Sequence, residues 1–134
     1  MTTSQVPPPM VHPAARRLTA QQRADRRLTG LDLQRQIKDL GAMLGWLHMH
    51  VRPAQTAAGW RTPVSGQLGK GWPDLVLVNP MRRRTLAVEV KREFEDVSPD
   101  QVYVHTMLRE AGWTVLVWRP SDMSEGRIQE ELSR

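Results

Sequence analysis

Residues 70–79 read KGWPDLVLVN, and the fold can be worked out from this stretch outward. The four consecutive apolar residues 75–78 are typical of a buried strand, but the acidic residue Asp74 stands directly before them. An ionised carboxylate is rarely placed beside a buried strand without a partner. Pro73 is tolerated at the first position of a strand, and Gly71 allows another part of the backbone to approach closely. The stretch therefore predicts a strand that begins with an acid in need of a partner.

A second strand is predicted over Thr85–Lys91. It follows a turn-rich connection at residues 79–84, which favours a hairpin with the strand after Asp74. Side chains alternate between the faces of a strand, so Glu89 and Lys91 project from the same face. In an antiparallel pair, the start of the first strand lies beside the end of the second. Asp74, Glu89 and Lys91 can therefore converge at one edge of a sheet.

Two elements and a long connection are expected before this hairpin. Apolar residues at helical spacing predict a helix from Leu33 to Leu44, and residues 46–51 are expected to form a strand. Residues 52–71 contain several glycines and prolines and almost no apolar periodicity. They are expected to form a long loop, and a loop of that length in a compact domain is usually functional or disordered.

One helix and one strand are expected after the hairpin. Ser98 is a predicted N-cap, Pro99 suits the first helical position, and Gly112 ends the helix. Residues 114–118 then form a strand, which is expected to pair in parallel because a helical crossover precedes it. The sequence thus predicts an α/β fold with the element order α-β-β-β-α-β and a mixed central sheet flanked by helices.

The chain is expected to contain one domain, over residues 29–120. Residues 1–28 are interpreted as a flexible basic arm with several prolines, and residues 121–134 as a tail that could form a short helix. The absence of cysteine excludes disulfides and thiolate metal sites. The sequence shows no bilayer-spanning apolar run and no signal peptide, which fits a cytoplasmic protein and no membrane partner.

The formal net charge of +5 at pH 7 is compatible with a polyanionic partner. A basic protein that is merely soluble remains the alternative. The chemistry of the predicted sheet edge is more specific. Two carboxylates and an ammonium suit a hard divalent cation such as Mg²⁺, which takes oxygen ligands and can activate water. The alternative is a salt bridge in which Lys91 neutralises Glu89 or Asp74.

Three short blocks of sequence resemble one family of enzymes. They are residues 71–74 (GWPD), residues 89–91 (EVK) and residues 98–101 (SPDQ). In this order and spacing they resemble the VRR-NUC family of the PD-(D/E)XK nuclease superfamily, whose small stand-alone members occur in phages and bacteria. The resemblance extends over roughly residues 29–120. It implies a restriction-endonuclease-like core that cleaves phosphodiesters with Mg²⁺ or Mn²⁺.

The resemblance also implies a role for each matching residue. Asp74 and Glu89 would be metal ligands, together with the backbone carbonyl of Val90. Lys91 would be the catalytic lysine. Gln101 would support the site from the helix, although its alternative role is that of capping-box partner to the N-cap serine.

Asp32 stands where members of the family commonly carry a glutamate, near the start of the first helix. It is kept as a candidate site residue, with a direct or water-bridged metal contact. Because aspartate is one methylene shorter, a direct contact is in doubt, and Thr29 and Asp32 also match a capping box. Candidates for nucleic-acid contact are Lys70, His50, Arg82, Arg83 and Arg84.

The sequence therefore predicts a Mg²⁺- or Mn²⁺-dependent endonuclease that acts on DNA and selects DNA structure, for example branched or flapped DNA. A homodimer is expected if both strands are cut together. One alternative is a nucleic-acid-binding module that keeps the fold without activity. Another is an interaction protein whose acids form salt bridges only.

Overall fold

The computed structural model describes residues 17–134 except 52–53 and 62–63. Its centre is a four-stranded sheet in the order β1-β4-β5-β6, formed by β1 (Leu47–His50), β4 (Leu75–Asn79), β5 (Arg84–Val90) and β6 (Val115–Trp118). The β1–β4 and β4–β5 pairs are antiparallel, and β5–β6 is parallel. The predicted mixed sheet, with a hairpin at its centre and a parallel last strand, is confirmed.

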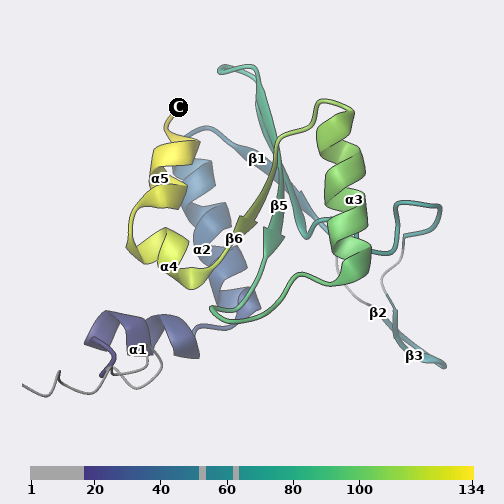
Figure 1. The fold of residues 1–134 in the computed structure, drawn as a ribbon. Coiled ribbons are helices and arrows are strands. Elements are labelled where there is room, and N and C mark those ends of the chain that lie inside the picture. The colour runs from purple at the N-terminus through teal and green to yellow at the C-terminus, as the bar shows by residue number, and fades with distance from the viewer. Residues whose placement is uncertain (1–16, 52–53, 62–63) are drawn as a thin grey trace, which may run out of the picture.

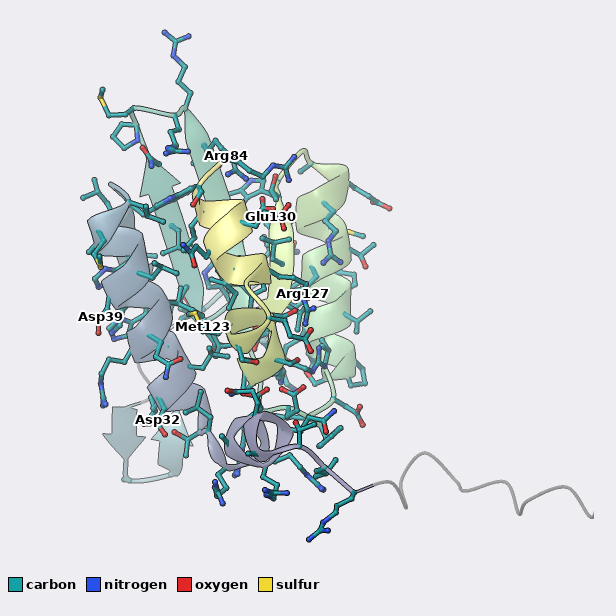
Figure 2. The ribbon with its side chains drawn as sticks, turned by 90° about the vertical axis from the view of Figure 1, so that its left-hand side faces the viewer. Asp32, Asp39, Arg84, Met123, Arg127 and Glu130 are labelled. Atoms are coloured by element: carbon teal, nitrogen blue, oxygen red, sulfur yellow. The ribbon has the colours of Figure 1, made fainter. Side chains whose placement is uncertain are left out.

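Helices cover both faces of the sheet (Figure 1). The helices α2 (Gly30–Met43), α4 (Pro120–Ser124) and α5 (Arg127–Leu132) lie on one face, and α3 (Pro99–Glu110) lies on the other. Figure 2 shows α2, α4 and α5 side by side on their face. Within the described residues, no helix is both long and apolar enough to span a bilayer.

The burial of the two central strands follows from these layers. In β4 the exposure alternates, so Leu75 and Leu77 are buried under α2 and α5 while Val76 and Val78 are half-buried. In β5 every residue from Leu86 to Val90 is buried, because this strand is covered on both faces. Glu89 therefore lies on the most enclosed strand of the molecule.

The predicted basic arm is wrong for its last part, where the structure has the helix α1 (Ala20–Arg27). A capping box formed by Thr19 and Gln22 begins this helix. Asp25 is buried and accepts a hydrogen bond from Ser124 at 2.8 Å. The sequence of α1 is almost entirely polar, so its stability depends on contacts with distant residues that periodicity does not reveal. Residues 1–16 of the expected arm lie outside the described residues.

The expected loop at 52–71 is corrected in part. It contains a small separate sheet, with β2 (Ala54–Thr56) paired to β3 (Gly59–Arg61), and it projects away from the main sheet in Figure 1. These strands are too short to show a period of two. The C-terminal tail has the helical structure that the sequence allowed, in α4 and α5, and Ile128 and Leu132 of α5 are fully buried in the main core.

Candidate active site

Asp74 lies directly before β4 and is held by the end of β5. Its Oδ2 accepts a hydrogen bond from the backbone N–H of Val90 at 2.8 Å. The N–H and C=O of one strand residue point to the same side of the strand, as the exchanged bonds of an antiparallel pair require. The carbonyl of Val90 therefore also faces the side of β5 on which Asp74 lies. The hairpin brings Asp74 to the end of the neighbouring strand, as expected.

Glu89 is 2% exposed and lies on the face of β5 that packs against α3. Its Oε1 accepts a hydrogen bond from Nε2 of Gln101 at 2.9 Å. Its Oε2 is buried and has no hydrogen-bond partner. Nε2 of His105 lies 3.6 Å from this oxygen. The carboxylate is thus half satisfied and has one oxygen available for a ligand.

The environment of Glu89 strongly favours its neutral form. Burial raises the pKa of Glu89 to about 9, and the negative charge of the neighbouring Asp74 adds to the effect. Lys91 opposes this rise and Glu95 contributes to it. Two neighbouring carboxyl groups cannot both ionise at low cost unless a cation joins them. Ionising both Asp74 and Glu89 is therefore costly in free energy unless a cation binds between them.

Gln101 fills both of the roles that the sequence left open. Its Oε1 accepts a hydrogen bond from the backbone N–H of Ser98 at 2.9 Å. The backbone N–H of Gln101 donates to Oγ of Ser98 at 3.2 Å. The same side chain donates from Nε2 to Glu89. The two roles are compatible because they use opposite ends of one amide.

Gly71 allows the chain before Asp74 to press against the first turn of α3. Its φ is +106°, and a Cβ at this position would lie 2.4 Å from the carbonyl oxygen of Asp100 and 2.9 Å from the nitrogen of Gln101. Only glycine fits such an approach without displacing backbone. This contact couples the segment that carries Asp74 to the helix that carries Gln101.

Lys91 is buried with 6% exposure and lies between two acids. Its Nζ is 3.5 Å from Oε2 of Glu95 and 4.0 Å from Oε1 of Glu89. The ion pair with Glu89 is the one that the salt-bridge alternative predicts. That alternative leaves Oε2 of Glu89 without a partner, so it does not account for the whole arrangement.

Comparison with protein families matches the VRR-NUC domain over residues 17–121, which is most of the chain. The chain belongs to the VRR-NUC family. This family is a PD-(D/E)XK-like nuclease domain. Comparison with curated proteins and with solved structures gave no match. The match begins at residue 17, before the expected domain start at residue 29, and therefore includes α1.

Asp32 of this VRR-NUC chain has a structural contact network of its own. Its Oδ2 accepts from the backbone N–H and the hydroxyl of Thr29, at 3.2 Å and 2.7 Å, and its Oδ1 is 4.0 Å from Arg35. The hydrogen bonds with Thr29 lower the pKa of Asp32 below its ordinary value. In the described residues no group of three or more His, Cys, Asp or Glu side chains could hold a metal. The structure therefore supports the capping box and does not bring Asp32 to Asp74 and Glu89.

The three consecutive arginines 82–84 lie at the turn of the β4–β5 hairpin. The pairing of Asn79 with Arg84 and of Leu75 with Val88 puts this turn at the opposite end of the hairpin from Asp74 and Glu89. Arg82 and Arg84 both bond to carbonyl oxygens of the C-terminal residues, and Arg84 also pairs with Glu131 at 2.5 Å. Arg83 is exposed. These side chains anchor the C-terminus or face solvent, away from Asp74 and Glu89, and their contact with nucleic acid stays a prediction.

Two other predicted contact residues lie nearer to the site. Lys70 is exposed and forms an ion pair of 3.3 Å with Asp100, in the first turn of α3. His50 pairs in register with Leu75, the residue after Asp74, and its ring stacks on His48 with centroids 6.2 Å apart. In the part of the chain that the structure describes, no third His, Cys, Asp or Glu joins these two histidines in a group that could hold a metal ion.

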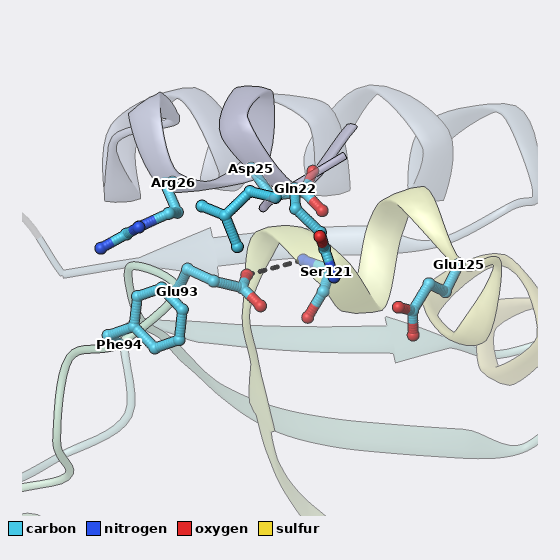
Figure 3. A pocket seen from close by; sticks show the side chains of 8 residues that line it. Gln22, Asp25, Arg26, Glu93, Phe94, Ser121 and Glu125 are labelled. Atoms are coloured by element: carbon cyan, nitrogen blue, oxygen red, sulfur yellow. Dashed lines mark hydrogen bonds between the residues drawn. The ribbon is translucent and has the colours of Figure 1, made fainter. Parts of the chain in front are cut away.

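The segment after Lys91 contacts both α1 and α4. The guanidinium of Arg26 lies 4.9 Å from the ring centroid of Phe94, and Glu93 accepts from the backbone N–H of Ser121 at 2.9 Å. Figure 3 shows these side chains around a cavity of about 210 Å³ between α1, this segment and α4. The helix α1 thus supports the residues that lead to Glu95.

His105 is a residue that the sequence analysis missed. It is 2% exposed, and its Nε2 is buried with no hydrogen-bond partner. A sequence signal exists, because His105 follows Gln101 by four residues and so shares its helix face. Glu95 was also missed, although it follows Lys91 by four residues in the segment before α3.

Proposed function

We propose that this VRR-NUC chain is a metal-dependent endonuclease that hydrolyses DNA phosphodiesters at the site formed by Asp74, Glu89 and Lys91. The observation that carries the proposal is the carboxylate of Glu89. It is almost fully buried, its pKa is raised to about 9, and one of its oxygens has no partner. An acid is retained in such a position at a large cost in free energy, which a bound cation would offset.

The residues present fit Mg²⁺ or Mn²⁺. Asp74, Glu89 and the carbonyl of Val90 supply only oxygen ligands, which these hard cations prefer. Few protein ligands also suit Mg²⁺, which usually keeps several waters. When bound, such an ion lowers the pKa of a coordinated water and stabilises charge on a phosphoryl oxygen.

The remaining groups orient the reactants. Lys91 places a compact positive charge next to Glu89, where it can hold the attacking water or stabilise the charge that develops on the phosphate. Glu95 fixes this ammonium from its other side. Gln101 holds one oxygen of Glu89, and the N–H of Val90 holds one oxygen of Asp74. Each reacting group thus has a fixed position on the sheet edge before substrate binds.

DNA is the proposed substrate, recognised by shape more than by sequence. The net charge of +5 favours a polyanion. None of the described elements projects as a free recognition helix, since each helix packs on the sheet or on another helix. Branched or flapped DNA is therefore proposed over a sequence-defined duplex site, and a homodimer is proposed if both strands are cut together.

Cleavage assays test this proposal. The purified protein is incubated with plasmid, flapped, branched and single-stranded DNA, with Mg²⁺, with Mn²⁺ or with EDTA. Asp74→Asn should abolish metal-dependent cutting, and Lys91→Met should slow it by about 10²–10³-fold. Asp39→Asn on the exposed face of α2 serves as the matched control (Figure 2). Cutting at the wild-type rate in both site variants contradicts the site assignment.

An inactive nucleic-acid-binding module is the second candidate. The observation that favours it is Asp32, which is engaged by Thr29 where the family commonly carries a glutamate. This reading predicts that the wild-type protein binds DNA but leaves it intact with either metal ion. The same assays, with a mobility-shift measurement added, separate the two candidates.

A further inference from the structure

Two buried polar atoms of the site face each other without a partner. Oε2 of Glu89 and Nε2 of His105 are the two side-chain atoms in the described residues that are buried and form no hydrogen bond, and they lie 3.6 Å apart. Both residues are 2% exposed. Each unpaired buried polar atom costs roughly 1–3 kcal/mol, so two such atoms side by side need an explanation.

We propose that His105 is a positioning residue for Glu89, in which a neutral imidazole donates from Nε2–H to Oε2 of the carboxylate. The inference rests on the proposed role of Glu89 as a metal ligand. With a metal ion bound, Glu89 would be ionised and would only accept hydrogen bonds, so the facing nitrogen has to carry the proton. The separation of 3.6 Å is longer than a hydrogen bond, so the proposal requires the two side chains to move closer together.

The helix α3 then supplies one donor to each oxygen of Glu89. Gln101 and His105 are one helical turn apart, on the face that packs against β5. Gln101 donates to Oε1 at 2.9 Å, and His105 faces Oε2. A carboxylate held at both oxygens cannot rotate about its Cγ–Cδ bond. Each oxygen has a second lone pair, so a cation can bind to the same carboxylate.

The position of His105 allows it to affect metal binding, because its Nε2 faces Oε2 of the proposed metal ligand Glu89 at 3.6 Å. A partner that fixes the orientation of a metal ligand typically changes metal affinity by about 10–100-fold when it is removed. An imidazole that only fills space in the core would not have this effect.

Metal binding provides a test that does not depend on cleavage. Mn²⁺ is titrated calorimetrically into the full-length wild-type protein and into Glu89→Gln, His105→Leu and His105→Gln. Leucine keeps much of the volume without the donor, and glutamine restores a donor. We expect Glu89→Gln to lose Mn²⁺ binding at the site, His105→Leu to weaken it by about 10–100-fold, and His105→Gln to recover most of the loss. Thermal unfolding without metal should show that each variant folds.

The outcomes separate this inference from the proposed function. If Glu89→Gln loses Mn²⁺ but His105→Leu binds as tightly as wild type, His105 is a packing residue and the inference is wrong. If the wild type and Glu89→Gln bind Mn²⁺ equally weakly, Glu89 is no metal ligand, and both this inference and the metal-dependent function fail. If Mn²⁺ binding follows the expected order but DNA stays intact, the inference holds and only the nuclease function fails.

The tautomer of His105 gives an independent readout. Nitrogen-15 correlation spectra of the Mg²⁺-saturated protein, with His105→Leu to assign the signals, should show a neutral ring protonated at Nε2. A ring protonated at Nδ1 with a bare Nε2 overturns the proposed hydrogen bond.

Discussion

Glu89 is the residue on which the proposed metal binding depends most. It is held on a strand covered from both faces, beside a second carboxyl group, with one oxygen unpaired. Its usual pKa of 4.5 rises to about 9 in the folded protein. Without a cation, the folded chain therefore binds a proton between these pH values that the unfolded chain does not.

The first prediction is a pH dependence of stability in the metal-free protein. Because the folded-state pKa of Glu89 is raised, its contribution is fully present below about pH 4.5 and is lost as the pH rises through about 9. Glu89→Gln removes this loss. The difference in free energy of unfolding between Glu89→Gln and wild type should grow in favour of the variant from pH 5 to pH 9.

Urea unfolding in EDTA at several pH values measures this difference. Asp39→Asn, an exposed carboxylate on α2, is the matched control and should leave the wild-type pH profile unchanged. Parallel profiles for Glu89→Gln and wild type would show that Glu89 ionises normally in the fold.

The second prediction concerns Lys91. Lys91→Met keeps the length of the side chain in its buried position but removes the charge between Glu89 and Glu95. We expect the cleavage rate to fall by about 10²–10³-fold, the usual cost of losing one charge-stabilising group. Mn²⁺ affinity should stay or increase, because a positive charge near the ligands is gone. Single-turnover rates and Mn²⁺ titration check both parts, and a parallel loss of rate and affinity would contradict the assigned role.

At the scale of elements, the contact between the segment before β4 and the first turn of α3 sets the spacing of Asp74 and Gln101. Gly71 makes this contact possible because its missing Cβ leaves room for the backbone of Asp100. Gly112, which follows α3, has a similar φ of +96°. Unlike at Gly71, no atom of the described residues, its chain neighbours aside, lies within 4 Å of the place where a Cβ would stand. The two glycines thus have similar φ angles but differ in how closely other atoms pack against them.

The third prediction compares alanine at these two positions. Gly112→Ala should cost about 1–2 kcal/mol in free energy of unfolding, from the left-handed conformation alone. Gly71→Ala should cost about 1–3 kcal/mol more, because its Cβ meets backbone, and it should also weaken Mn²⁺ binding by displacing Gln101. Equal costs in urea unfolding, with unchanged metal affinity, would show that the contact does not position the site.

Sequence patterns predicted the elements with strong local signals. The apolar run after Asp74, the alternation that ends in Glu89 and Lys91, and the cap at Ser98 all have their expected structure. The convergence of the two acids followed from the hairpin alone. His105 was not singled out, since a lone histidine on an apolar helix face is usually a core residue, and its meaning depends on the strand it packs against.

Other elements could not be predicted because their stability comes from distant contacts. The helix α1 is polar, and it is held by the bond between Asp25 and Ser124, which are 99 residues apart. The helices α4 and α5 have five and six residues, too few for a clear period. Arg84 resembles a solvated turn residue in sequence, but it pairs with Glu131 and lies over the ring of Trp46.

At the scale of the whole molecule, α1 ties the N-terminal part of the described chain to the opposite end of the sequence. Asp25 bonds to Ser124 in α4, Arg26 lies over Phe94, and Leu28 packs on the main core. The segment that contains Phe94 leads to Glu95, the partner of Lys91. Residues before 29 thus support both the core and the surroundings of the site.

The fourth prediction follows for a truncated chain. A protein of residues 29–134 should be less stable than one of residues 17–134 by about 2–4 kcal/mol, from the lost burial of Leu28 and the lost hydrogen bonds of Asp25. Chemical unfolding of the two chains measures the difference. Equal stability would show that the domain begins at residue 29 after all.

We propose that Asp74 and Glu89 together hold the divalent ion that the cleavage reaction uses. Anomalous X-ray scattering from a crystal of the protein loaded with Mn²⁺ tests this proposal directly. We expect an anomalous peak in contact with the carboxylates of Asp74 and Glu89 and the carbonyl of Val90, and its loss in Glu89→Gln. A protein that cleaves DNA with Mn²⁺ but shows no peak at these residues would contradict the proposal.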